Sequence, residues 1–290
     1  MAKKAKKTAL RPTGKETDPA GLALLARGAA AELARRLRAV RAEVLGLLLE
    51  PALLGLRAEA ALTVNAGLDP FRQGPELVAA FRRKVQEIIH KHLMGKIPGG
   101  LGRPARYWWQ RFTEAARSKG FRDATFALGG AIASQVGSLG ASASSAVSGA
   151  LLAVERQVGS LLAFGGRLAA RITSALTDQL SKARGTPAAA GRGVAAAVAA
   201  FAGWQARRWG RHELQSEYAS GQLEAFREAG VAEVRLQAEF TTAGDGKVCR
   251  ACQARVGQVY TLEEAEGIIP LHIGCRCIWL AVLVAGPLSG

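Results

Sequence analysis

Five side chains near the end of the chain have the residue types and the spacing of a metal site. All four cysteines of the 290 residues lie after residue 248, where they combine with one histidine as Cys-x2-Cys-x19-His-x2-Cys-x-Cys. Two pairs of soft ligands separated by a loop are what a tetrahedral zinc site requires. The five residues are Cys249, Cys252, His272, Cys275 and Cys277.

A four-coordinate ion leaves one of the five donors spare. A Cys-x2-Cys turn places two thiolates on one side of a metal, so Cys249 and Cys252 form the first pair. His272 and Cys275 form a second pair, and Cys277 could replace either of them or lie behind the site as a buried thiol. Two disulfides are an alternative, but no export signal supports an oxidising compartment. Unrelated buried thiols are a further alternative, which the clustering with a histidine disfavours.

The pattern favours a structural zinc ion over a catalytic one. A catalytic zinc keeps an open coordination position and needs a nearby general base. Zinc deaminases join His-x-Glu to Pro-Cys-x-x-Cys, whereas here "RHEL" (211–214) lacks the spacer and "VCRAC" lacks the proline. A His-Asn-His nuclease would need more histidines beside the cluster. We therefore expect no catalytic residues and no enzyme, with the metal replacing a core that so small a module cannot build.

The segments that carry the ligands read as a small α+β module over residues 231–290. Apolar and polar residues alternate in "VAEVRLQAEF", which predicts a half-exposed strand, and "GQVY" and "CIWLAVLV" are further strand candidates. Thr261 and Glu264 form a capping box that opens a short helix between them.

The rest of the chain predicts helices. Residues 1–17 read as a basic disordered arm, and residues 18–230 as an elongated helical body. Asp18 and Pro19 read as the N-cap and first residue of a helix over 18–50. Further helices are expected over 75–94 and 155–182 and, after a break at 183–193, up to a C-cap at Gly230. The fold class is thus mainly α, with a small C-terminal α+β zinc-knuckle module.

Two stretches of the helical body allow more than one interpretation. Tyr107, Trp108, Trp109 and Phe112 could anchor a partner or stack on bases, although core packing is the commoner explanation. Residues 124–154 carry no charge, which raises the question of a membrane segment. Their serines and glycines favour a buried helical hairpin or an oligomer interface, and membrane insertion in another state is the less favoured alternative.

The chain is strongly basic, with a formal net charge of +16. From Thr241 onward four basic residues balance four acidic ones, so the whole excess lies in residues 1–240. Such an excess indicates a polyanionic neighbour: nucleic acid, an acidic protein surface or an anionic membrane. Charge that serves solubility alone is the simpler alternative.

The stretch from "GRHELQSEYASGQLEAF" to "PLHIGCRC" resembles the phage minor head protein family, the Mu F-like head morphogenesis proteins. That family ends in Cys-x2-Cys, a glycine, and Pro-Leu-His-x-x-Cys-Arg-Cys, and carries Arg-Thr-Glu on the preceding helix. The resemblance covers residues 205–280. Beyond the ligands, the matching positions are Arg211, Glu213, Gly257, Pro270, Leu271 and Arg276.

This chain departs from the family pattern at three places, none of which is a proposed metal ligand. His212 stands for the threonine, Ile273-Gly274 for a common Pro-Asn, and Phe240 for a common tryptophan. Arg211 and Glu213 are expected to dock their helix on the zinc module, and Gly257, Pro270 and Arg276 to support it.

The resemblance implies a structural component of the virion. Such a protein would be present in several copies, would associate with the portal or the inner capsid and with packaged DNA through the basic N-terminal two-thirds, and would assemble in the host cytoplasm. A nucleic-acid-binding zinc protein without a capsid role is the first alternative. A zinc-dependent hydrolase or transferase is a weaker one.

Overall fold

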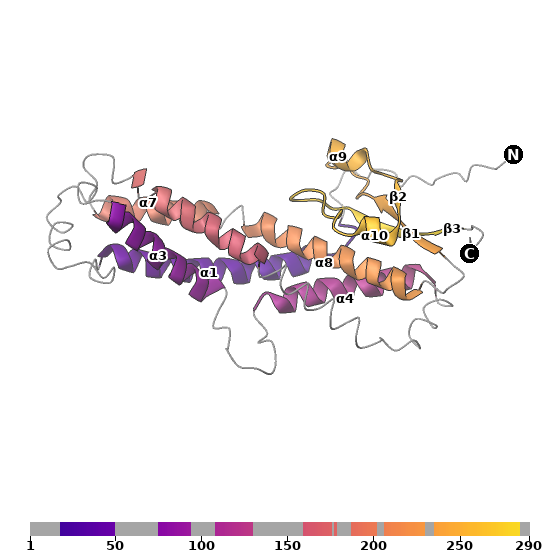
Figure 1. Cartoon of the computed structure of the whole chain (residues 1–290), viewed down its shortest axis with the longest axis horizontal. Coiled ribbons are helices and arrows are strands. Elements are labelled where there is room, and N and C mark those ends of the chain that lie inside the picture. Colours follow the sequence, from indigo (N-terminus) through magenta and orange to yellow (C-terminus); the bar gives the residue numbers. More distant parts are fainter. Residues whose placement is uncertain are drawn as a thin grey trace. The chain divides into compact units, whose positions relative to one another are not determined.

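The computed structural model describes residues 18–49, 75–93, 108–129, 159–175, 177–178, 187–201, 206–229 and 235–284. The fold is mainly α with a small three-stranded antiparallel sheet at its C-terminal end, so the expected fold class is confirmed (Figure 1). Residues 159–175 are helical as well. The other helices are α1 (Ala23–Leu49), α3 (Pro75–Leu93), α4 (Gln110–Ala127), α7 (Pro187–Ala200), α8 (Ala206–Ala229), α9 (Arg250–Gln253) and α10 (Leu262–Ala265).

The chain forms two compact units. One contains the described residues within 1–26, 112–142 and 211–290, and the other those within 27–111 and 143–210. This division differs from the expected boundary at residue 230, because the C-terminal residues share a hydrophobic core with α4 and α8. We call the unit that contains residues 211–290 the C-terminal unit and the unit that contains residues 27–111 the helical unit.

Apolar residues recur every three or four positions between Leu22 and Leu47, which predicts one buried stripe along the helix. Helix α1 buries this stripe but begins later than expected. Asp18 and Pro19 lie in a turn, and Gly21 adopts a left-handed φ of 61° that interrupts the chain before the helix. The Asp18 carboxylate still accepts a hydrogen bond of 2.6 Å from the backbone N–H of Ala23. The residues of the predicted stripe that are buried are Leu22, Ala29, Leu33, Leu37, Val40, Val44 and Leu47.

Aromatic rings fill the core of the helical unit. Trp109 is fully buried and stacks on Trp209 with ring centroids 4.7 Å apart. Phe164, from the 159–175 helix, lies 4.9 Å from Trp209 and 4.9 Å from Phe201. Core packing is therefore the role of Trp109, as favoured above.

The break expected over 183–193 is shorter, since α7 begins at Pro187, a residue suited to a first helical position.

Helices α4 and α8 lie side by side in the C-terminal unit (Figure 1). A Cβ atom on Gly120 of α4 would lie 2.0 Å from the carbonyl oxygen of Tyr218, and one on Gly221 of α8 would lie 2.1 Å from that of Arg117. Each helix thus meets the other through a glycine, which lets the two backbones touch. Arg117 also pairs with Glu224 across the crossing, at 2.9 Å.

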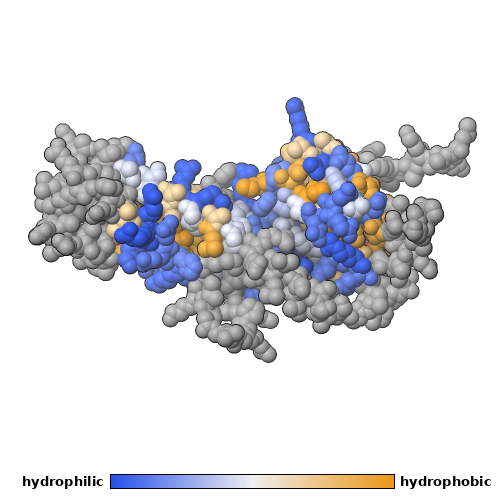
Figure 2. Space-filling model, in the orientation of Figure 1, coloured by the Kyte–Doolittle hydropathy of each residue, from blue (hydrophilic) through white to orange (hydrophobic). Residues whose placement is uncertain are grey.

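The sheet has the strand order β2-β1-β3, with β1 (Arg235–Thr241) between β2 (Val259–Tyr260) and β3 (Ile278–Val284). Leu236, Ala238 and Phe240 of β1 are buried, as the alternation predicts. Phe240 pairs with Trp279 of β3, and their rings meet edge to face at 5.7 Å. Figure 2 shows hydrophobic residues gathered over this part of the molecule.

Some expectations fall outside the described residues. These are the arm over 1–17, the C-cap at Gly230 and most of the uncharged stretch 124–154, of which residues 124–129 are described. Among the described helices, none combines the length and the apolar character that crossing a membrane requires.

Candidate metal centre

Two loops of the C-terminal unit carry the five donors. Cys249 is the N-cap of α9, and Cys252 lies within that helix. The backbone N–H of Cys252 donates a hydrogen bond to the Cys249 sulfur, at 3.4 Å. The chain then turns at Gly257, whose left-handed φ of 79° suits glycine. The Gly257 N–H donates to the carbonyl of Phe240 at 2.9 Å, which ties this first loop to β1.

The second loop leads into β3. It follows α10, whose predicted capping box between Thr261 and Glu264 is present. The Ile269–Pro270 peptide bond is cis. His272, Cys275 and Cys277 follow, and the backbone N–H of Cys275 donates to the carbonyl of His272 at 3.0 Å.

The structure brings all five predicted donors together. Their ligand atoms form two groups of three, within each of which all atoms lie within 4.8 Å of one another. One group is Cys249, Cys252 and His272, and the other is Cys252, Cys275 and Cys277. The cluster could therefore hold a metal ion, and Cys252 is the donor that belongs to both groups.

One sulfur–sulfur distance within the cluster matches a tetrahedral metal site, and the His272 ring lies within hydrogen-bonding distance of two sulfurs. The His272 Nε2 atom lies 3.0 Å from the Cys249 sulfur and 3.1 Å from the Cys252 sulfur, and the Cys252 and Cys275 sulfurs are 3.8 Å apart. The edge between two sulfurs of a tetrahedral zinc site with normal Zn–S bonds is also about 3.8 Å.

The tautomer of His272 follows from its surroundings. Its Nδ1 atom lies 3.0 Å from the carbonyl oxygen of Ile273. Because a carbonyl can only accept, Nδ1 carries a proton, which leaves Nε2, the ring nitrogen nearest the two sulfurs, as the nitrogen that could bind a metal. A backbone carbonyl commonly fixes a metal-binding imidazole in this way.

The thiols of the cluster differ in acidity. A hydrogen bond from the Cys277 side chain lowers the pKa of Cys275 to about 5. The same contact, together with burial, raises the pKa of Cys277, and burial raises the pKa of Cys252 to about 12. A metal ion bound by Cys252 must therefore displace a proton from its thiol.

The space at the cluster is small. The cavity lined by the two loops has a volume of about 20 Å³. Such a volume accommodates one ion or one water molecule. It is too small to enclose an organic substrate.

A buried ion pair joins the two ligand loops. Arg276 lies between Cys275 and Cys277, and its guanidinium donates to both carboxylate oxygens of Asp245, with Nη2 2.7 Å from Oδ1. The two side chains are 8% and 2% exposed. The expected supporting role of Arg276 thus has a defined partner, which the sequence reasoning missed.

Helix α8 contacts the backbone of the second loop and of β3. The Gln215 amide donates to the carbonyl of Cys277 at 2.7 Å, and Gln222 bonds both the N–H and the carbonyl of Trp279, at 3.1 and 3.0 Å. Burial lowers the pKa of the His212 ring, and the neighbouring backbone of His272 opposes that shift. Sequence reasoning did not assign these roles, although the three residues share one helix.

Arg211 and Glu213 lie on the same helix as these residues. Arg211 Nη2 is 3.6 Å from Asp18 Oδ1, in the segment that precedes α1. The expectation that Arg211 and Glu213 dock α8 on the cluster stays a prediction.

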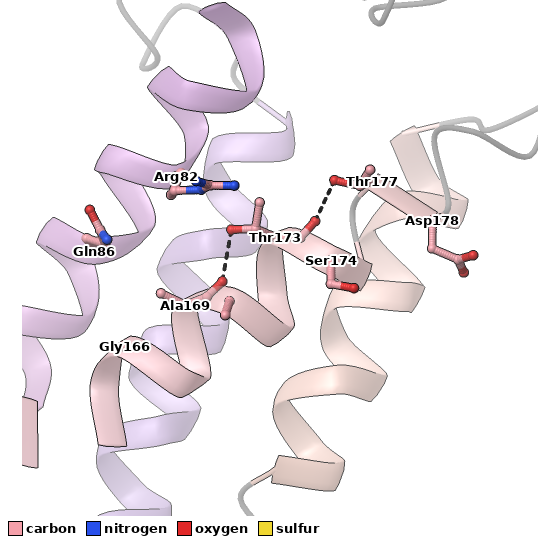
Figure 3. Close-up of a pocket in the computed structure, with 9 residues that line it drawn as sticks. Arg82, Gln86, Gly166, Ala169, Thr173, Ser174, Thr177 and Asp178 are labelled. Atoms are coloured by element: carbon pink, nitrogen blue, oxygen red, sulfur yellow. Dashed lines mark hydrogen bonds between the residues drawn. The ribbon is translucent and has the colours of Figure 1, made fainter. Parts of the chain in front are cut away.

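A second hollow lies in the helical unit, between α3 and the 159–175 helix. This groove has a volume of about 600 Å³ and is lined by Arg82, Gln86, small residues and hydroxyl groups. Figure 3 shows Arg82 reaching from α3 toward the helix that carries Thr173. The hydroxyls of Thr173 and Thr177 donate to carbonyls of their own helix, at 2.9 Å each. The described lining contains no cysteine or histidine.

No protein-family model, curated protein or solved structure matches this chain. The site is therefore interpreted from its own chemistry and from the sequence resemblance.

Proposed function

We propose that the chain is a phage minor head protein, a structural virion component that associates with the portal or the inner capsid and with packaged DNA. The observation that supports this most is that the metal-binding residues of the family's two terminal motifs lie together in the structure. The two cysteines of the first loop lie against the histidine and cysteines of the closing Pro-Leu-His-x-x-Cys-Arg-Cys.

We infer that the metal is zinc and that its role is structural. Four thiols and one imidazole form a donor set that suits zinc. The 3.8 Å separation of the Cys252 and Cys275 sulfurs and the small cavity support a closed site. A closed site has no open position for a substrate or an activated water, which argues against the hydrolase or transferase alternative.

Contact with DNA is proposed for the helical unit. Twelve of the described arginines of this unit are exposed, and no ion pair with a described carboxylate is found for nine of them. Arginine pairs well with phosphate because its planar guanidinium can donate two parallel hydrogen bonds. Figure 2 shows a mainly hydrophilic surface over α3. The nine residues are Arg27, Arg38, Arg41, Arg82, Arg83, Arg167, Arg171, Arg192 and Arg207.

The DNA contact can be tested by salt-dependent binding. We expect the full chain to bind a short duplex with an affinity that falls steeply as salt rises. Replacing Arg82, Arg83, Arg167 and Arg171 with Gln should weaken binding and flatten the logarithmic salt slope, by about 0.9 per lost phosphate contact. Arg35→Gln is the matched control, since Arg35 already pairs with Glu32 at 2.7 Å. An unchanged slope in the fourfold variant would count against this surface.

The head-protein assignment is tested in particles. We expect mass spectrometry of purified heads from the encoding phage or prophage to find the chain in a few copies per particle. Its absence from heads, in lysates where the chain is expressed, would overturn the assignment. Together with DNA binding in vitro, that absence would favour a nucleic-acid-binding zinc protein without a capsid role.

A further inference from the structure

The two ligand loops are held together by contacts that need no metal. The first loop begins with the turn around Asp245, where the backbone N–H of Lys247 donates to Asp245 Oδ1 at 3.0 Å and that of Val248 donates to the Asp245 carbonyl at 3.2 Å. This turn leads directly into Cys249. On the second loop, Arg276 separates two of the cysteines. The Asp245–Arg276 pair therefore joins one ligand segment to the other.

The geometry of this pair makes it a specific clamp. Each of the two guanidinium nitrogens that face Asp245 donates a hydrogen bond to a different carboxylate oxygen. This bidentate pairing fixes the relative orientation of the two groups. Both side chains are almost completely buried. Removing one partner would leave a charge without compensation in the protein interior, which is strongly unfavourable.

A hydrophobic core surrounds three of the four cysteines. Three of the four cysteines, Cys252, Cys275 and Cys277, are 2% exposed and belong to one hydrophobic cluster with side chains of α8, β1 and β3. Trp279 of β3, Phe226 of α8 and Phe240 of β1 are the largest of these neighbours that are fully buried. The cluster thus packs against a substantial core to which α8 contributes, and the expectation that the metal replaces a missing core stays a prediction.

We propose that the Asp245–Arg276 ion pair positions the two ligand loops in the metal-free chain, so that the metal enters a preformed site. This inference rests on the proposed metal site. It differs from the behaviour of a small zinc finger, in which ligand binding and folding are one event. Asp245 and Arg276 act here as positioning residues, since neither offers a donor to the ion.

Thiol reactivity in the metal-free chain tests the positioning directly. The full chain, stripped of metal by a chelator and kept reduced, is alkylated, and each cysteine is followed by mass spectrometry. Cys249 is exposed and should react first. Cys252, Cys275 and Cys277 are buried and should react at least about tenfold more slowly, because alkylation then requires local opening.

Two variants weaken the clamp in different ways. Asp245→Asn removes the negative charge with which Arg276 pairs. Arg276→Lys keeps the charge but cannot donate two parallel hydrogen bonds, so it remains informative if the first variant does not fold. In both we expect faster alkylation of Cys275 and Cys277 with little change at Cys249. Glu266→Gln, which breaks the exposed Arg227–Glu266 pair of the same unit, should leave all four rates unchanged.

Two results would overturn the proposal. One is a metal-free wild-type chain in which Cys275 and Cys277 react as fast as Cys249. The other is full protection of both thiols in the two variants. Zinc affinity, measured on the same samples against a chromophoric chelator, should fall about 10- to 100-fold in the variants. A wild-type chain that binds no zinc would remove the proposed metal function, while the alkylation pattern would still decide the positioning role.

Discussion

Cys252 is the donor on which both halves of the cluster depend. Its sulfur belongs to each group of three ligand atoms, and its side chain is buried. We therefore expect Cys252→Ala to reduce zinc binding more than any other single replacement in the cluster, by at least about 100-fold in affinity.

The comparison requires each of the five single variants, with zinc content and affinity measured after purification. His90→Ala, on the exposed face of α3, serves as the control and should bind zinc normally. One of the remaining four variants should retain most of the affinity, because a tetrahedral ion uses four of five donors. Near-normal binding by Cys252→Ala would contradict the shared position of this residue.

Glu32 gives a prediction of pH dependence in the helical unit. A hydrogen bond from Arg35, aided by Arg36, lowers the pKa of Glu32 from 4.5 to about 2. Because the folded-state pKa lies below the unfolded one, the stabilisation is complete above about pH 4.5 and is lost as the pH falls toward 2.

We expect Glu32→Gln to lower the free energy of unfolding at pH 7 by less than about 1 kcal/mol, since the ion pair is partly exposed to solvent. At pH 3 the difference from wild type should be smaller. Urea denaturation at the two pH values measures it, and a larger difference at pH 3 would contradict the sign.

At the residue scale the sequence reveals what depends on residue type. Cysteine and histidine are rare here and carry their chemistry in their spacing, so all five donors could be predicted. Asp245 and Gln215 could not, because acidic and amide residues are common and their partners lie 31 and 62 positions away. The Gly-Asp-Gly turn just before the first cysteine is a sequence signal that could have pointed to Asp245.

The backbones of α4 and α8 come very close to each other where the two helices cross. A Cβ at position 221 would lie 2.1 Å from the backbone carbonyl oxygen of Arg117. Because the clash is with the backbone, moving a side chain cannot relieve it. We expect Gly221→Ala to lower the free energy of unfolding by about 2 kcal/mol or more, as overpacked contacts do.

Gly46→Ala is the matched control within α1. A Cβ there has no neighbour within 4 Å, so the substitution should stabilise the helix by about 0.5–1 kcal/mol. Urea denaturation of both variants measures the contrast. Equal effects at the two positions would contradict the close approach of α4 and α8.

Gln222 hydrogen-bonds the backbone of β3, which is an edge strand of the sheet. Its side-chain amide bonds both polar groups of the Trp279 backbone, as a neighbouring strand would. We expect Gln222→Ala to cost about 2–4 kcal/mol of folding free energy, because two buried backbone groups lose their partner.

The exposed Gln258 bonds the carbonyl of Ala254, and Gln258→Ala should cost less than about 1 kcal/mol. Urea unfolding followed by tryptophan fluorescence measures both variants. A loss at Gln222 no larger than that at Gln258 would contradict its role at the edge of β3.

At the element scale, periodicity predicts the buried faces better than the ends. The apolar stripe of α1 and the alternation of β1 agree with burial. The start of α1 was predicted at Asp18–Pro19, and the interruption at Gly21 was missed because a local glycine conformation overrode a good cap signal. The short β2 was recognisable, but its pairing with β1 depends on tertiary contacts.

At the scale of the whole molecule, the metal should stabilise a unit that already has a core. We expect a chelator to lower Tm by about 10 °C, the shift for a ligand held about a thousandfold above its Kd in a chain of this size. Far-UV circular dichroism should change little at 25 °C. Collapse of the helical signal on metal removal would mean that the ion is needed for folding itself.

The division of the chain into units was the least predictable property. A change in sequence texture near residue 230 indicated a new module, and the sheet and the donors do lie beyond it. The core that covers the sheet, however, also takes Ala124 from α4 and Phe226 from α8. Contacts between segments a hundred residues apart leave no local mark in the sequence.

We propose that the five-donor cluster binds one structural zinc ion, and elemental analysis of the purified, reduced full chain measures this. We expect about one zinc per chain, retained through gel filtration and absent from Cys252→Ala. A reduced chain that carries no metal and takes up none from added zinc would contradict it.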